Sequence, residues 1–99
     1  MNIHELSLIT FGLKGRLLKL RTEATELANS IDRWEEGKGT LEEILHEILD
    51  VDYVENSIMI SNDFPTTCTY IDIHDRKSFE KLTKAIEDVR EKGLPEVQG

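Results

Sequence analysis

The chain has 99 residues, and its 20 Asp and Glu residues outnumber its 12 Lys and Arg residues, which gives a formal charge of −8. This charge disfavours direct binding to nucleic acid or to an anionic membrane surface. The single cysteine, Cys68, excludes an internal disulfide, and the sequence lacks both a signal-peptide pattern and an apolar run that could cross a membrane, so we expect a cytoplasmic protein.

Helical periodicity describes the first part of the chain. Ile3, Leu6 and Ile9 lie three residues apart and predict a short helix that ends near Gly12. A second helix is predicted from Leu13 to about Glu36, because apolar residues recur there at steps of three and four. These residues are Leu13, Leu17, Leu20, Ala24, Leu27, Ala28, Ile31 and Trp34.

A third helix is predicted after a glycine-containing break at residues 36–40. Thr40 and Glu43 match a capping box, in which the two side chains satisfy free backbone N–H groups at a helix start. The helix is expected to run over residues 41–61. Its apolar side is formed by Leu41, Ile44, Leu45, Ile48, Val51, Val54 and Ile58.

The last part of the chain is predicted to hold a loop and one more helix. Residues 62–75 are typical of a loop, and the alternation at residues 70–73 allows a short strand within it. An amphipathic helix is predicted over residues 76–92, ended by Gly93 and Pro95. Together these elements predict one domain over residues 1–99, an all-α bundle of about four helices that is completed by oligomerisation.

Two pairs of carboxylates carry the strongest functional signal. Glu23 and Glu26 are three residues apart on the second predicted helix, and Glu47 and Asp50 have the same spacing on the third. Residues three apart share a helix face, so antiparallel packing of the two helices would bring four carboxylates together. Such a group suits Mg²⁺, with Mn²⁺ as the alternative ion, whereas either pair alone is typical of a solvated helix surface.

This arrangement resembles the motif of the MazG-type nucleoside triphosphate pyrophosphohydrolases. That motif is Glu-Glu-x-x-Glu, a variable spacer, and Glu-x-x-Asp, and the chain is similar to it over about residues 3–61. Val51 follows the second pair as in the family, and residues 9–14 resemble the stretch that precedes the motif in small, phage-type members. The chain departs from the pattern at Thr22, where the family has its first glutamate, which puts catalysis in question.

The resemblance implies an all-α dimer or tetramer that uses Mg²⁺ to hydrolyse nucleoside triphosphates to a monophosphate and pyrophosphate. It implies metal ligation by Glu23, Glu26, Glu47 and Asp50, with Glu26 also orienting the attacking water. The alternative is a non-catalytic nucleotide-binding or protein-interaction protein on a degenerate MazG-like scaffold, which the threonine at position 22 favours.

Other polar and aromatic residues have two interpretations each. Lys19 could meet a terminal phosphate or pair with Glu23 one turn later, and Trp34 could stack on a base or belong to a core or subunit interface. Ser57 could reach a nucleotide or bond to its own helix backbone. A di-iron centre would need two Glu-x-x-His motifs, and the sequence has one, at Glu43 and His46.

Overall fold

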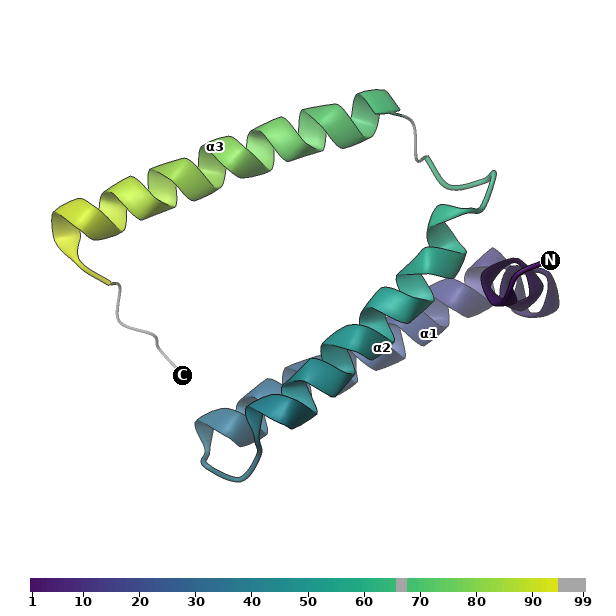
Figure 1. Ribbon diagram of the computed structural model, residues 1–99, viewed down its shortest axis with the longest axis horizontal. Helices are drawn as coiled ribbons and strands as arrows, with labels where there is room; N and C mark the ends of the chain where they lie inside the picture. The colour runs from purple at the N-terminus through teal and green to yellow at the C-terminus, as the bar shows by residue number, and fades with distance from the viewer. Residues whose placement is uncertain (66–67, 95–99) are drawn as a thin grey trace. The chain divides into compact units, whose positions relative to one another are not determined.

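A computed structural model of the protein describes residues 1–65 and 68–94, with the backbone alone at residues 68 and 69. Its described residues form three α-helices and no strand, so the predicted all-α class is confirmed (Figure 1). The chain divides into two units, Met1–Phe64 and Pro65–Gly99. No helix in the described ranges combines the length and apolarity needed to cross a membrane.

The first two predicted helices form one element, α1 (Ile3–Glu35), which is kinked at Gly12. Asn2 begins the helix, and its side chain accepts a hydrogen bond from the backbone N–H of Glu5 at 2.9 Å. At Gly12 the backbone leaves the helical region, with φ 73° and ψ 168°. The predicted break is therefore present, but it is a kink within one element. This explains why the described residues contain three helices where about four were predicted.

The kink lets the first ten residues of α1 turn across the end of α2 (Leu41–Met59). The rings of His4 and Tyr53 lie 4.8 Å apart, centroid to centroid, at an angle of 59°. Figure 1 shows the purple N-terminal segment running in a different direction from the rest of α1. The direction of this segment therefore depends on a backbone conformation that only glycine adopts readily.

Substituting Gly12 with alanine is expected to destabilise the N-terminal unit by about 1–3 kcal/mol, because a side chain is strained at this φ and ψ. No atom lies within 4 Å of the position that a Cβ would occupy, so the cost is conformational and not steric. Chemical denaturation measures the effect. Lys14→Ala, at an exposed position nearby, is the control and should change stability by less than about 0.5 kcal/mol. Equal stability of the two variants would contradict the assigned kink.

α2 packs alongside the second part of α1 as an antiparallel hairpin (Figure 1). One half of the predicted capping box is present, since the Thr40 side chain accepts a hydrogen bond from the backbone N–H of Glu43 at 3.2 Å, whereas the Glu43 carboxylate lies near Arg33 instead. In the connecting turn the backbone N–H groups of Lys38 and Gly39 both donate to the carbonyl of Arg33. These bonds satisfy groups at the end of α1 and hold the two helices side by side.

The buried apolar core of the hairpin is small. Val54 and Ile58, at 4% and 2% exposure, are the buried apolar residues of the described ranges. Several residues of the predicted apolar stripes are instead about half exposed, including Trp34, Leu45 and Ile48. The stripes thus exist as predicted, but the hairpin by itself covers only part of them.

α3 (Cys68–Lys92) is longer than the helix predicted over residues 76–92. Residues 70–75, predicted as loop with a strand as the alternative, are helical. Their alternation was misleading, because Tyr70 and Ile73 also satisfy a helical spacing of three. Residues 66 and 67 of the predicted loop lie outside the described ranges.

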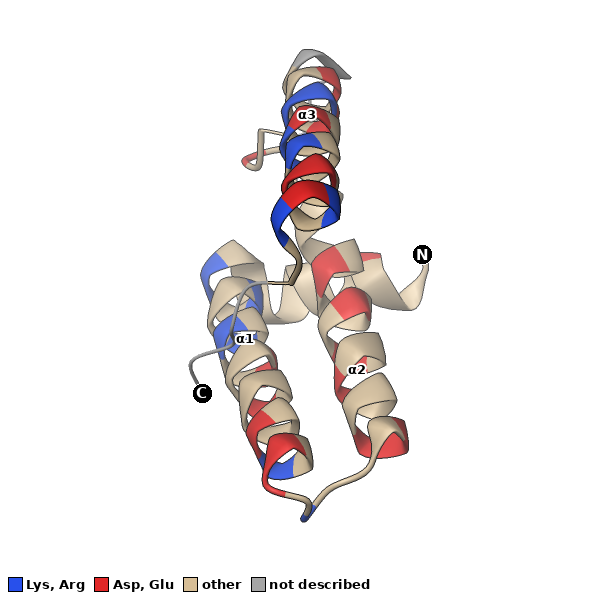
Figure 2. Cartoon of the chain, turned by 90° about the vertical axis from the view of Figure 1, so that its left-hand side faces the viewer, with Lys and Arg blue, Asp and Glu red and all other residues tan. Residues whose placement is uncertain are grey.

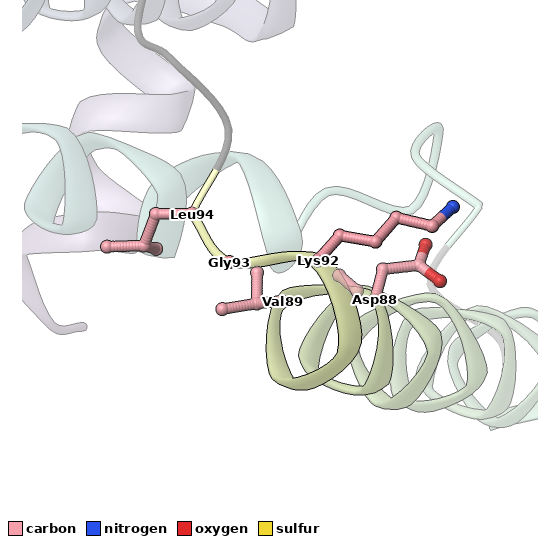
Figure 3. Close-up of a pocket in the computed structure, with 6 residues that line it drawn as sticks. Asp88, Val89, Lys92, Gly93 and Leu94 are labelled. Atoms are coloured by element: carbon pink, nitrogen blue, oxygen red, sulfur yellow. The ribbon is translucent and has the colours of Figure 1, made fainter.

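The predicted end of α3 is confirmed at Gly93, which has φ 81° and donates its N–H to the carbonyl of Val89 at 2.7 Å. Pro95, the other expected stop signal, is outside the described residues. A shallow hollow at this helix end is drawn in Figure 3. It is lined by Ala85, Asp88, Val89, Lys92, Gly93 and Leu94. None of the predicted site residues lies in it.

Candidate metal centre

The register of the α1–α2 hairpin is marked by a hydrogen bond from Arg16 Nε to Ser57 Oγ, 3.1 Å long. α1 and α2 run in opposite directions. An equal number of residues forward along α1 and backward along α2 from this contact therefore reaches the same height along the hairpin. Ten steps lead to Glu26 on α1 and to Glu47 on α2. The packing that connects Arg16 with Ser57 therefore also places the two predicted acidic segments opposite each other.

Three of the four predicted ligands come together. Glu23, Glu26 and Glu47 each offer one carboxylate oxygen that lies within 4.8 Å of the other two. We call these three residues the carboxylate cluster. Glu23 is buried at 6% exposure, Glu47 is half-buried and Glu26 is exposed, so the cluster is open to solvent on one side. Asp50 is exposed and is not part of the cluster.

Lys19 supplies one positive charge to the carboxylate cluster. Its Nζ lies 2.8 Å from Oε1 of Glu23, one helical turn further along α1, as the sequence predicts for a surface ion pair. Two other carboxylate oxygens of the cluster lack such a partner within the described chain. Oε2 of Glu23 and Oε2 of Glu47 are buried and have no hydrogen-bond partner among the described residues. Buried carboxylate oxygens without partners are costly, so the cluster lacks part of its compensating positive charge.

Glu23 and Glu26 have pKa values that are shifted in opposite directions. The hydrogen bond from Lys19 holds the pKa of Glu23 below its usual value of 4.5, despite its burial. The charge of Glu23 in turn raises the pKa of Glu26, with a smaller contribution from Glu47. The same pairing raises the pKa of Lys19 above 10.5. Near neutral pH the cluster therefore holds adjacent negative charges of which only one has a direct cationic partner.

The donor set matches a hard divalent cation. Carboxylate oxygens are the ligands that Mg²⁺ and Mn²⁺ prefer, and the two unpartnered oxygens are the atoms such an ion would satisfy. Glu43 is engaged elsewhere, 3.9 Å from Arg33 Nε, and His46 is not part of the cluster. Thr22 donates its hydroxyl to the Leu18 carbonyl and offers no ligand to the cluster.

The other predicted binding residues have distinct placements. Trp34 is 46% exposed and lies two turns beyond Glu26, about 12 Å along the helix axis, so it is not part of the cluster. Ser57 is buried and donates to the Val54 carbonyl at 2.7 Å, which confirms the backbone-bonding interpretation. The contact between Ser57 and Arg16 was not anticipated. Arg16 precedes the first acidic pair by the same number of residues as Ser57 follows the second pair. This spacing indicates a contact only once the register of the two helices is known.

The comparisons with known proteins found no match: no family model, no curated protein and no solved structure is similar to this chain.

Adding Mg²⁺ is expected to raise the melting temperature at pH 7.5, because an ion that binds the folded state stabilises it by mass action. At ten to one hundred times the dissociation constant the gain is about 1.4–2.7 kcal/mol. Differential scanning fluorimetry over a Mg²⁺ series measures it, with K⁺ at matched ionic strength as the control. A melting temperature that responds equally to both salts would contradict a specific site.

The same stabilisation is expected to shrink as the pH falls. Glu26 is protonated before Glu23, since the charge of Glu23 raises the pKa of Glu26 above 4.5. Protonation of Glu26 removes a ligand charge, which weakens ion binding, and it relieves the repulsion between Glu26 and Glu23, so the contribution of Glu26 to the stability of the metal-free protein rises as the pH falls. The contribution of Glu23 has the opposite sign, because its pKa is lowered in the folded state. Repeating the Mg²⁺ series from pH 7.5 down to pH 4.5 measures both the ion-induced shift in melting temperature and the melting temperature of the metal-free protein. An ion-induced shift that grows toward acidic pH would refute the assignment of Glu26.

Proposed function

We propose that the chain is a cytoplasmic, Mg²⁺-dependent nucleotide pyrophosphohydrolase of MazG type, which converts nucleoside triphosphates to a monophosphate and pyrophosphate. The observation that carries the proposal is the carboxylate cluster with its two buried, unpartnered oxygens. Glu23, Glu26 and Glu47 are the principal ligands, and Asp50 is the fourth ligand implied by the resemblance. Asp50 follows Glu47 by three residues, at the helix level of Glu23, so a rotamer change could bring it to the ion.

A bound Mg²⁺ or Mn²⁺ would neutralise part of the phosphate charge and would lower the pKa of a bound water. A protein of charge −8 needs such a cation to bind a polyanion. Glu23 and Glu47 hold the ion from the buried side of the cluster. Glu26 faces solvent and has a pKa raised by the charge of Glu23, so it is a stronger base than Glu23. We assign to Glu26 the orientation and deprotonation of the attacking water.

Lys19 has a second role in this proposal. It is the partner of Glu23 in the metal-free protein, and a cation bound at the cluster would take over that compensation. The ammonium group, half exposed on a flexible side chain, would then be available to a substrate phosphate. Trp34 is proposed to meet the base only at the outer end of the site, since it lies about 12 Å beyond Glu26.

We propose that the active form is a homo-oligomer, a dimer or a tetramer. The support is the extent of uncovered apolar surface, since only Val54 and Ile58 are buried apolar residues of the described chain. Such large exposed apolar faces are typical of subunit interfaces. Size-exclusion chromatography with light scattering at micromolar concentration should give two or four times the 11.4 kDa chain mass. A monomer at all concentrations would contradict this part of the proposal.

The direct test is the release of pyrophosphate from a panel of ribonucleoside and deoxyribonucleoside triphosphates. Product analysis should show equal amounts of monophosphate and pyrophosphate with Mg²⁺ and neither product with a chelator. Orthophosphate in place of pyrophosphate would indicate cleavage of a different bond. If no triphosphate in the panel is hydrolysed, the enzymatic proposal fails for these substrates.

One observation favours a second candidate, a non-catalytic protein that binds nucleotides or a protein partner. Thr22 has replaced the family's first glutamate, and its hydroxyl is bonded to the Leu18 carbonyl. With Asp50 outside the cluster, three carboxylates converge where the family motif provides more. Calorimetry with a non-hydrolysable triphosphate separates the candidates, because a binding protein would retain the Mg²⁺-dependent affinity without any turnover.

A further inference from the structure

Arg16 is held rigidly between the two helices of the hairpin. Its Nε donates to Ser57 Oγ at 3.1 Å, and Ser57 is itself 1% exposed and anchored to the Val54 carbonyl. On the other side, the guanidinium carbon lies 5.5 Å from the centre of the Phe11 ring. A long side chain that contacts both a buried hydroxyl and an aromatic ring has lost most of its conformational freedom before any ligand arrives.

The two terminal nitrogens of Arg16 have no hydrogen-bond acceptor or ion-pair partner among the described residues. Within the described part of the chain no carboxylate lies within 4.0 Å of them, and no acceptor other than the Ser57 hydroxyl bonds to the guanidinium. This is notable in a chain with 20 Asp and Glu residues. The fork of N–H donors on a guanidinium is the group that matches two oxygens of a phosphate.

The position of Arg16 connects it to the carboxylate cluster. Glu23 lies seven residues further along α1, two turns away on the same face, about 10 Å along the axis. Lys19 lies between them, and the Arg16 charge opposes the rise in the pKa of Lys19 that Glu23 causes. Figure 2 shows that most basic positions of α1 lie in the part nearer the kink and that acidic positions predominate toward the turn.

We propose that Arg16 forms an anion subsite that binds the terminal phosphate of a polyphosphate whose inner phosphates lie at the carboxylate cluster. The inference rests on the proposed function for the placement of the inner phosphates. Ser57 and Phe11 are positioning residues, because they hold the guanidinium and do not themselves meet the ligand. The subsite gives an acidic protein a fixed positive group beside the terminal phosphate. A single ion at the carboxylate cluster would contact only the inner phosphates.

Calorimetric titration of the full chain with inorganic pyrophosphate in Mg²⁺ tests the subsite without requiring turnover. Arg16→Gln should raise the dissociation constant at least tenfold, the size expected for a lost charge-assisted pair. Lys14→Gln removes an exposed charge two residues away and should change it less than twofold. Equal effects of the two variants, or no effect of Arg16→Gln, would overturn the proposal.

Two further variants separate ligand binding from a structural role. Arg16→Lys keeps the charge but loses the fork, and Ser57→Ala keeps the guanidinium but frees it. Both should weaken pyrophosphate binding severalfold while leaving the helical circular dichroism spectrum unchanged. They also decide the question if Arg16→Gln does not fold. Unchanged affinity in both variants would assign Arg16 to hairpin packing alone.

The result can be told apart from a failure of the proposed function. If no triphosphate is hydrolysed but pyrophosphate binding depends on Arg16, the enzymatic proposal fails and the anion subsite stands. If triphosphates are hydrolysed and Arg16→Gln leaves KM unchanged, the enzyme stands and the subsite is refuted. With both correct, Arg16→Gln raises KM at least tenfold, and Lys14→Gln does not.

Discussion

Replacing Glu47 by glutamine is expected to lower pyrophosphate release from the best triphosphate substrate by roughly a hundredfold or more, because the site loses one ligand charge. Glutamine keeps the shape of the side chain, so the change isolates the charge. Glu47 Oε2 is buried and has no partner among the described residues, which means that its charge has no assigned structural role. The expected loss is therefore one of catalysis and not of folding.

The matched control is Glu43→Gln, on the same face of α2 one turn earlier. Glu43 lies 3.9 Å from Arg33 at the surface and is not part of the carboxylate cluster, so its loss should change the rate less than twofold. Removing charge at Glu47 relieves like-charge repulsion, so the melting temperature of Glu47→Gln in a chelator should equal or exceed that of the native chain. Full activity in Glu47→Gln would refute the metal centre, and equal losses in both variants would point to a general charge effect.

Truncating Ile58 to alanine is expected to cost about 2–5 kcal/mol of unfolding free energy, as for other buried isoleucines. Ile58 is 2% exposed and, with Val54, makes up the buried apolar core of the hairpin. A domain of this size has a total stability of roughly 5–15 kcal/mol, so the variant should lose a large part of it and its unfolding midpoint in urea should fall. Urea denaturation followed by circular dichroism measures the loss.

Ile9→Ala is the control for this experiment, because Ile9 is 67% exposed on the N-terminal segment of α1. It removes the same atoms from a helix and should cost less than about 1 kcal/mol. A loss as large as that of Ile58→Ala would show that Ile9 is covered in solution, as in the proposed oligomer. A small loss at Ile58 would mean that the core assigned to the hairpin is wrong.

Much of the secondary structure could be predicted because local patterns decide it. The Thr40 cap, the interruption at Gly12 and the helix end at Gly93 depend on local chemistry, and each is present in the structure. Two features of the secondary structure could not be predicted from local sequence patterns. A glycine that interrupts a helical pattern can either separate two helices or kink one, and residues 70–75 fit a strand and a helix equally well.

The candidate site was predicted in part for the same reason. Spacing along each helix placed Glu23 with Glu26 and Glu47 with Asp50, and antiparallel packing brought the first three together. Rotamers and register were beyond the sequence, so the exclusion of Asp50 from the cluster could not be foreseen. The Arg16 to Ser57 bond joins residues 41 positions apart, and no periodicity within one helix could indicate it.

The distribution of charge between the two helices has a consequence for how a ligand approaches. α2 contains no lysine or arginine, so every basic group along the hairpin between the kink and the turn comes from α1. Along α1 most basic residues lie nearer the kink and most acidic residues nearer the turn, so charge is distributed unevenly along the hairpin and its kink end is the less negative one. A polyphosphate carrying a cation at one end also has an uneven distribution of charge, and the two fields align before contact. Weak long-range attraction thus selects the orientation, and salt should slow association more than it speeds dissociation.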